Sequence, residues 1–166
     1  IMQRAEINDF SLPGIQGGEL HNFTVGVLGT GRIGRAVIRD LSGFGCRIYA
    51  YDAYENEEVK KYAQYADLDT IYKECDLLTL HMPLENAHLL DAAAFAKMKD
   101  GVVIINTARG GLIDTKALIN ALENEKVGAV GLDVIEDEFG MYYYDRKSDI
   151  LSKKDLYILR GFPNVI

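Results

Sequence analysis

The chain has few cysteines and no long apolar run. Its two cysteines, Cys46 and Cys75, form no C-x-x-C pair, and the three histidines show no metal-ligand spacing. Each cysteine lies in or beside an apolar segment, so we expect buried, reduced thiols, no metal site and a cytoplasmic protein. No apolar run approaches the roughly twenty residues of a membrane-spanning helix, and we expect neither a signal peptide nor a membrane partner.

An excess of positive charge is also absent. The chain carries 18 lysines and arginines against 25 aspartates and glutamates, for a net charge of −7, and its basic residues are scattered. Nucleic acids and anionic membranes bind basic surfaces, so this balance argues against both as the main partner. The length of 166 residues, with 48% hydrophobic residues, suits one well-packed globular domain.

From residue 23 onward, strand-like and helix-like segments alternate. The predicted strands are 23–28, 46–51, 76–80, 102–106 and 127–132, with weaker ones at 64–66 and 164–166. The predicted helices are 32–43, 55–62, 68–74, 91–98, 115–124 and about 150–160. Continuous apolar strands are typical of a parallel sheet covered on both faces. The alternation therefore predicts an α/β fold with a doubly wound parallel sheet, the Rossmann-type dinucleotide-binding domain.

The first 22 residues differ from this pattern. They contain a short helical segment at 2–8 and a turn-rich segment at 12–18. We expect residues 1–22 to be a lead-in arriving from elsewhere and residues 23–166 to be the nucleotide-binding domain.

The most informative motif is a G-x-G-x-x-G formed by Gly29, Gly31 and Gly34. It lies between an apolar strand and a helical pattern, which is the context that the dinucleotide fingerprint requires. The first glycine permits a tight turn, the second lets backbone approach a pyrophosphate, and the third lets the helix pack on the strand. An ordinary glycine-rich turn is the alternative.

Asp52 follows the second strand, eighteen residues after Gly34. A carboxylate at this point accepts hydrogen bonds from the hydroxyls of the adenosine ribose and repels a 2′-phosphate, which favours NAD over NADP. A solvated or helix-capping aspartate is the alternative.

Three loops after predicted strands carry further chemistry: 81–84, 106–111 and 133–138. In one parallel sheet they open toward the same crevice as the glycine turn. Arg109, in the second loop, can hold a substrate carboxylate bidentately and polarise the carbonyl beside it. A solvated arginine is the alternative.

With these motifs in order, the chain resembles the D-isomer-specific 2-hydroxyacid dehydrogenases. The resemblance covers residues 23–166 and rests on the segments 29–34, 81–84, 106–114 and 131–138. The segment 139–145 is similar to the D-lactate dehydrogenase branch. The resemblance implies an NAD-dependent, reversible reduction of a 2-keto acid, with pyruvate and D-lactate as the expected pair, and a homodimer.

The resemblance also implies roles for individual residues. Arg109 is the expected substrate-binding arginine, and Glu138, rather than Glu136, is the glutamate that orients a catalytic histidine. The expected cofactor contacts, which include Arg109 again, are Gly29, Gly31, Arg32, Ile33, Gly34, Asp52, Met82, Pro83, Thr107, Ala108, Arg109 and Asp133. We expect Arg32 and Ile33 at the pyrophosphate, and Thr107, Ala108 and Asp133 near the nicotinamide.

The chain departs from the family's pattern in its histidines. The family's catalytic histidine lies a few residues beyond a segment that matches 163–166, and none of the three histidines fits that role. His21 precedes the first strand, His88 is expected to begin a helix, and His81 lies in the crevice, where polar packing is favoured over proton transfer. We therefore expect this chain alone to lack the catalytic histidine and the substrate domain, and to be inactive alone.

Two features stay open. The loop 83–90 is about two residues shorter than usual, which leaves a contact from Asn86 to the cofactor undecided. The cluster Tyr142, Tyr143 and Tyr144 can line a pocket or pack in a core or an interface.

Two hypotheses follow for the function. In the first, the chain is the cofactor-binding part of an NAD-dependent D-2-hydroxyacid dehydrogenase. In the second, it is a freestanding NAD(H)-binding or redox-sensing module whose output is a partner protein.

The position of Asp52 predicts a change in cofactor choice. Asp52→Ala should weaken binding of NADH and relax the discrimination against NADPH, because the acceptor for the ribose hydroxyls and the repulsion of a 2′-phosphate are both lost. Titration with each cofactor, followed by nicotinamide fluorescence, measures both effects. An unchanged preference would remove Asp52 from the site.

Overall fold

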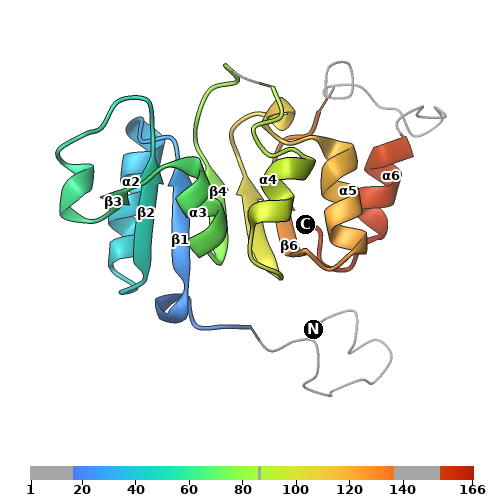
Figure 1. Cartoon of the computed structure of the whole chain (residues 1–166), viewed down its shortest axis with the longest axis horizontal. Coiled ribbons are helices and arrows are strands. Elements are labelled where there is room, and N and C mark those ends of the chain that lie inside the picture. The colour runs from blue at the N-terminus through green and yellow to red at the C-terminus, as the bar shows by residue number, and fades with distance from the viewer. Residues whose placement is uncertain (1–16, 86, 137–153) are drawn as a thin grey trace.

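A six-stranded, all-parallel sheet in the order β3-β2-β1-β4-β5-β6 forms the centre of the molecule (Figure 1). The computed structural model describes residues 17–85, 87–136 and 154–166. The strands are β1 (Thr24–Leu28), β2 (Arg47–Tyr51), β3 (Gln64–Tyr65), β4 (Leu77–Leu80), β5 (Val102–Asn106) and β6 (Val127–Leu132). This topology confirms the predicted doubly wound α/β fold.

The helices are α2 (Arg32–Ser42), α3 (Leu68–Glu74), α4 (Ala92–Lys97), α5 (Thr115–Glu123) and α6 (Lys154–Gly161), with single 3₁₀ turns η1 (Leu20–Asn22), η2 (Val59–Lys61) and η3 (Gly110–Leu112). Aspartate fixes the start of three of them. The side chains of Asp67, Asp91 and Asp114 accept hydrogen bonds from backbone N–H groups in the first turns of α3, α4 and α5. Such caps satisfy donors that have no partner inside the helix.

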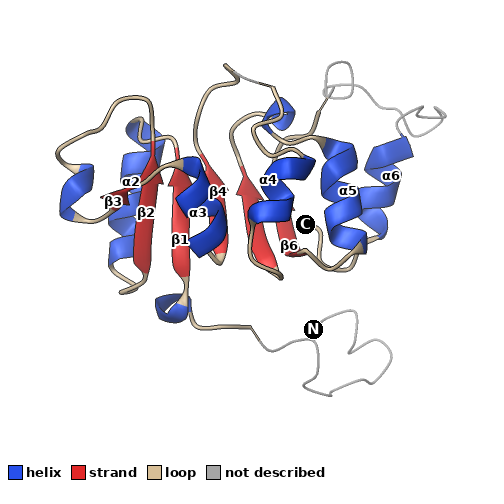
Figure 2. Ribbon diagram, in the orientation of Figure 1, coloured by secondary structure: helices blue, strands red, loops and turns tan. Residues whose placement is uncertain are grey.

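Helices lie on both sides of the sheet, as Figure 2 shows. On one side, Ile38 of α2 and Val59 of η2 pack with Val25, Val27 and Ile48 of the strands. On the other, α3, α4, α5 and α6 contribute to a larger apolar cluster. The helices cover the strands unevenly. β1 is buried over most of its length, whereas buried and half-buried residues alternate along β5.

One predicted helix and one predicted helix start are wrong. The segment 55–62 contains only the turn η2, because the side chain of Asn56 accepts from the Glu58 N–H and fixes a tight turn there. His88 does not begin a helix: it lies in a turn with a φ of 58°, and α4 begins only after the Asp91 cap.

The weak strand at 164–166 does pair with the sheet. Val130 donates to the Asn164 carbonyl at 3.0 Å, and Ile166 donates to the Val130 carbonyl at 3.0 Å, in a parallel bridge beside β6. The expected helix at 2–8, the start of the expected helix at 150–160 and most of the turn-rich lead-in lie outside the described residues. Within the part of the chain that is described, no helix has the length and apolar character to cross a membrane.

Two glycines permit the turn between β1 and α2. Gly29 has a φ of 97°, a left-handed conformation, and a Cβ there would lie 2.6 Å from the carbonyl oxygen of His81. A Cβ on Gly34 would lie 1.9 Å from the carbonyl oxygen of Gly29. By contrast, a Cβ on Gly31 would meet no protein atom within 4 Å.

This contrast predicts that alanine is destabilising at Gly34 and nearly neutral at Gly31. Gly34→Ala should lower the free energy of unfolding by about 3 kcal/mol, because the new methyl group overlaps a backbone carbonyl that cannot move without shifting the turn. Gly31→Ala, its matched control, should change stability by less than about 0.5 kcal/mol. Thermal or urea unfolding measures both variants, and equal losses would contradict the packing described here.

Candidate dinucleotide site

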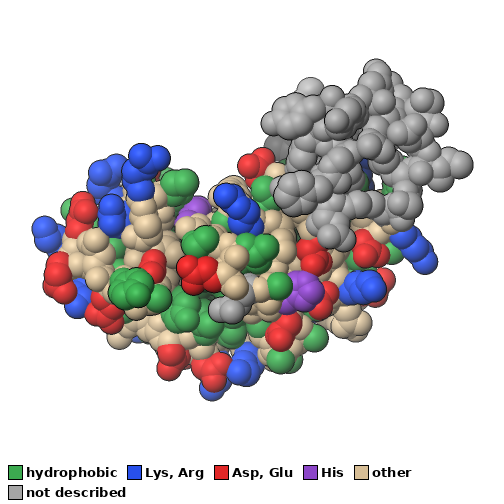
Figure 3. Space-filling view, turned by 90° about the horizontal axis from the view of Figure 1, so that it is seen from above, with side chains coloured by type: hydrophobic (Ala, Val, Ile, Leu, Met, Phe, Trp, Pro, Cys, Tyr) green, Lys and Arg blue, Asp and Glu red, His purple; other side chains and the backbone are tan. Residues whose placement is uncertain are grey.

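The strands end level with one another at the carboxyl edge of the sheet. Leu28, the last residue of β1, is in register with Tyr51 and Leu80, and Asn106 is in register with Leu80 and Leu132. The predicted site loops therefore begin side by side. Figure 3 looks onto this edge and shows histidine and charged side chains of both signs on it.

A cavity of about 450 Å³ opens at this edge beside the glycine turn. β1 and β4, which flank its base, are the strands at which the sheet order reverses, the usual ligand position in such folds. The residues that line it are Gly29, Gly31, Tyr51, Asp52, Ala53, Tyr54, His81, Met82, Pro83, Glu85 and Leu89. The structure thus brings together Gly29, Gly31, Asp52, Met82 and Pro83 of the predicted set.

Asp52 is held by backbone and side-chain donors. Its Oδ2 accepts from the backbone N–H of Thr30 at 2.6 Å and from the Thr30 hydroxyl at 3.0 Å, and its Oδ1 accepts from the Tyr54 N–H at 3.2 Å. Burial raises the pKa of Asp52, but these hydrogen bonds outweigh it and leave the pKa below its usual value. The group is therefore an ionised acceptor at neutral pH.

The residues present fit a dinucleotide. Among the described residues, no side chain caps the N-terminus of α2 at Gly31, so the first N–H groups of the helix can bind a pyrophosphate. The open space above the Gly31 Cα leaves room for backbone to approach it. Arg32 and Ile33, both exposed, lie in the first turn of the same helix, so their contacts with a pyrophosphate stay a prediction.

A buried asparagine organises the loop that carries Arg109. Asn106 is 0% exposed, and its amide donates to the Arg109 carbonyl at 2.9 Å while accepting from the Ala108 N–H at 3.0 Å. The backbone of 107–109 is thereby fixed, while the Arg109 side chain stays exposed and donates to the Ala108 carbonyl at 2.7 Å. A guanidinium on a rigid loop is suited to bind a carboxylate.

Asp133 begins the neighbouring loop, and its N–H donates to the Asn106 carbonyl at 3.0 Å. Asp133 and Thr107 are both exposed at this edge, as the prediction for the nicotinamide region requires. Glu138, Asn86, Tyr142, Tyr143 and Tyr144 lie outside the described residues, so their predicted roles stay predictions.

His81 is bound within the protein. Its Nε2 lies 2.9 Å from the Thr79 hydroxyl, and burial lowers the pKa of the imidazole below its usual value. A neutral, packed histidine is what the polar-packing interpretation expects.

His88 and Glu136 form a second cluster, between the loop after β4 and the loop after β6. The His88 Nε2 lies 2.5 Å from the Glu136 carboxylate, whose other oxygen accepts from the Thr115 N–H at 2.9 Å. The His88 backbone N–H donates to the Gly111 carbonyl at 2.8 Å. The hydrogen bond to Glu136 raises the pKa of His88, with smaller contributions from Asp114 and Asp91. Burial raises the pKa of Glu136, but bonds from Thr115 and His88 outweigh it and leave that pKa lowered.

Comparison with known proteins identifies the domain. Residues 2–166 match the family model described as "D-isomer specific 2-hydroxyacid dehydrogenase, NAD binding domain". The chain belongs to this family. NAD is accordingly the cofactor of the domain.

Relatives of this NAD-binding domain have several activities. The chain is 47% identical to an aromatic 2-oxoacid reductase of Clostridium sporogenes and 43% identical to a D-lactate dehydrogenase of Escherichia coli, in each case over 99% of the chain and 51% of the relative. The crystal structure of D-lactate dehydrogenase with NAD⁺ from Lactobacillus jensenii superposes with a TM-score of 0.90 at 38% identity, over 99% of this chain and 51% of that one. The chain thus spans about half the length of the curated relatives it matches.

Four residues that shape this edge of the sheet were not among the predicted site residues: Thr30, Asn106, His88 and Glu136. Thr30 lies within the glycine motif at 29–34 and Asn106 within the segment 106–114, but neither was given a role of its own. The loops that follow β4 and β6 were expected at one edge of the parallel sheet, but no local signal showed that His88 and Glu136 would meet there.

The pKa values of His81 and His88 should be shifted in opposite directions from the usual histidine value. NMR should find the His88 pKa above, and the His81 pKa below, the usual value of about 6.5. Glu136→Gln should lower the pKa of His88 and leave the pKa of His81 unchanged. A raised pKa means that the pair stabilises the fold fully below pH about 6.5 and that this contribution is lost as pH rises through the folded-state pKa of His88. A His88 that keeps its pKa in Glu136→Gln would contradict the pairing.

Proposed function

We propose that this chain is the cofactor-binding domain of an NAD-dependent D-2-hydroxyacid dehydrogenase that reversibly reduces a 2-keto acid. The observation that carries the proposal is the exposed Arg109 on a loop fixed by buried Asn106, at the same sheet edge as the cavity beside Asp52. A dinucleotide site and a carboxylate-binding cation on neighbouring loops are what this reaction needs.

Bound NADH supplies the hydride, and the protein supplies positioning and charge. We propose that Asp52 accepts hydrogen bonds from the adenosine ribose and that the N-terminus of α2 binds the pyrophosphate. Arg109 would hold the substrate carboxylate and polarise the carbonyl that is reduced, which stabilises the negative charge that develops on its oxygen. Glu138 would orient the histidine that exchanges the proton, as the resemblance implies.

Pyruvate and D-lactate are the proposed substrate pair. The D-lactate dehydrogenases among the relatives support this pair. The aromatic 2-oxoacid reductase at 47% identity indicates that aromatic 2-oxoacids are the competing class of substrate. Comparing pyruvate with phenylpyruvate as substrates distinguishes the two.

Location and assembly are part of the proposal. Cys46 and Cys75 are both free and buried, which supports a reducing, cytoplasmic environment. A homodimer rests on the resemblance alone, and sedimentation of the native-length protein tests it.

The role of Arg109 predicts a separation of binding from catalysis. In the native-length protein that contains this chain, Arg109→Ala should lower kcat/KM for the keto acid by about 10²- to 10³-fold, because a charge that stabilises the transition state is lost. The dissociation constant of NADH, measured by nicotinamide fluorescence, should change little.

Arg39→Ala is the matched control, since Arg39 lies in the last turn of α2 with a 64% exposed side chain. A large loss of NADH affinity in Arg109→Ala would instead assign Arg109 to the cofactor. Failure of the unmodified protein to bind NADH at millimolar concentration would overturn the proposed function itself.

A further inference from the structure

We propose that Tyr65 is a positioning residue for cofactor recognition, acting through Thr30 to hold the Asp52 carboxylate in place for the adenosine ribose. The proposal rests on the predicted ribose contact of Asp52 and adds two residues to it, Thr30 from the turn after β1 and Tyr65 from β3. No sequence motif marks Tyr65, which lies on the short edge strand β3.

A chain of hydrogen bonds links Tyr65 to Asp52. The Tyr65 hydroxyl donates to the Thr30 hydroxyl at 2.9 Å, and the Thr30 hydroxyl donates to Asp52 Oδ2 at 3.0 Å. At its far end, the Tyr65 hydroxyl accepts from the Asn56 N–H at 2.9 Å. Thr30 is only 3% exposed, so its hydroxyl has little access to water as an alternative partner.

The direction of these bonds follows from the chemistry of the end groups. The Asn56 N–H can only donate and the ionised carboxylate of Asp52 can only accept, so both hydroxyl protons point toward Asp52. The Thr30 proton is thereby committed to Oδ2, which also accepts from the Thr30 N–H at 2.6 Å. Oδ1 accepts from the Tyr54 N–H at 3.2 Å and, as a carboxylate oxygen with two lone pairs, retains the capacity to accept from a ribose hydroxyl.

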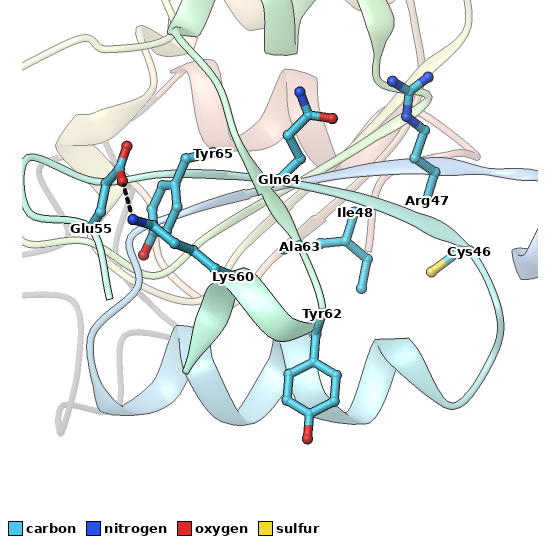
Figure 4. Close-up of a pocket in the computed structure, with 9 residues that line it drawn as sticks. All are labelled: Cys46, Arg47, Ile48, Glu55, Lys60, Tyr62, Ala63, Gln64 and Tyr65. Atoms are coloured by element: carbon cyan, nitrogen blue, oxygen red, sulfur yellow. Dashed lines mark ion pairs between the residues drawn. The ribbon is translucent and has the colours of Figure 1, made fainter. Parts of the chain in front are cut away.

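The Tyr65 ring is fixed by the sheet and by its neighbours. Tyr65 is in register with Ala50 of β2 and packs against the apolar cluster under α2. Figure 4 shows it in the wall of a hollow of about 640 Å³, next to the ion pair of Lys60 with Glu55. The Tyr65 hydroxyl is held by one donor, the Asn56 N–H, and by one acceptor, the Thr30 hydroxyl.

Without the Tyr65 hydroxyl, the Thr30 hydroxyl loses its donor. Its own bond to Asp52 Oδ2 is then no longer polarised by a donor behind it and weakens, although the carboxylate keeps its bonds from the Thr30 and Tyr54 N–H groups. The cost should fall on recognition of the ribose 2′-hydroxyl, since Asp52 is the group that this chain orients, and it should spare the rest of the cofactor.

The test compares NADH, NADPH and an NADH analogue that lacks the 2′-hydroxyl of the adenosine ribose, in the native-length protein. Tyr65→Phe should raise the dissociation constant of NADH about 3- to 10-fold, narrow the preference over NADPH by a similar factor, and leave binding of the 2′-deoxy analogue nearly unchanged. Tyr49→Phe is the matched control, because the Tyr49 hydroxyl bonds to Arg47 within β2.

A second pair of variants covers the case in which Tyr65→Phe does not fold. Thr30→Val removes the intermediate hydroxyl and should reproduce the loss for NADH, whereas Thr30→Ser keeps the hydroxyl and should retain most of the affinity. Equal weakening of NADH and the 2′-deoxy analogue, or unchanged NADH affinity in both Tyr65→Phe and Thr30→Val, would overturn the role of Tyr65. If Asp52→Ala itself leaves NADH binding unchanged, the predicted ribose contact fails instead.

Discussion

The contact between Gly34 and the carbonyl of Gly29 is the constraint on which the candidate site depends. It holds the first turn of α2 against the end of β1, where even one methyl group would overlap backbone. Because the helix starts so close to the strand, its N-terminus faces the cavity beside Asp52 and His81. Dinucleotide binding in this domain is therefore a result of backbone packing before any charged side chain contributes.

Level strand ends extend this arrangement across the sheet. Parallel pairing brings the residues after β1, β2, β4, β5 and β6 to one edge, so residues far apart in the sequence become neighbours. Buried polar groups then fix each loop: Thr30 holds Asp52, and Asn106 holds the backbone at Arg109. Asn106 makes these bonds within its own loop, whereas Thr30 bonds across to the loop after β2.

The sequence was sufficient to predict the sheet, most helices and the cavity-lining set of Gly29, Gly31 and Asp52, because strand periodicity and the glycine spacing are local signals. It could not predict the turn at His88 or the bond between His88 and Glu136, since both depend on loops separated by 48 residues. The helix expected at 55–62 does not form for a local reason: the Asn56 side chain accepts from the backbone N–H of Glu58, and the sequence alone does not say whether this bond forms.

The sheet order places the two ends of the candidate site on different parts of the sheet. Thr30 follows β1, Asp52 follows β2 and Tyr65 lies in β3, an edge strand of two residues. Asn106 ends β5, and Arg109 and Asp133 lie in the loops after β5 and β6. β4 lies between the two groups. Substitutions at this edge strand can therefore alter the proposed contacts with the adenosine ribose while the loops proposed to serve the substrate keep their geometry. The arrangement places cofactor choice and substrate binding under separate parts of the sheet.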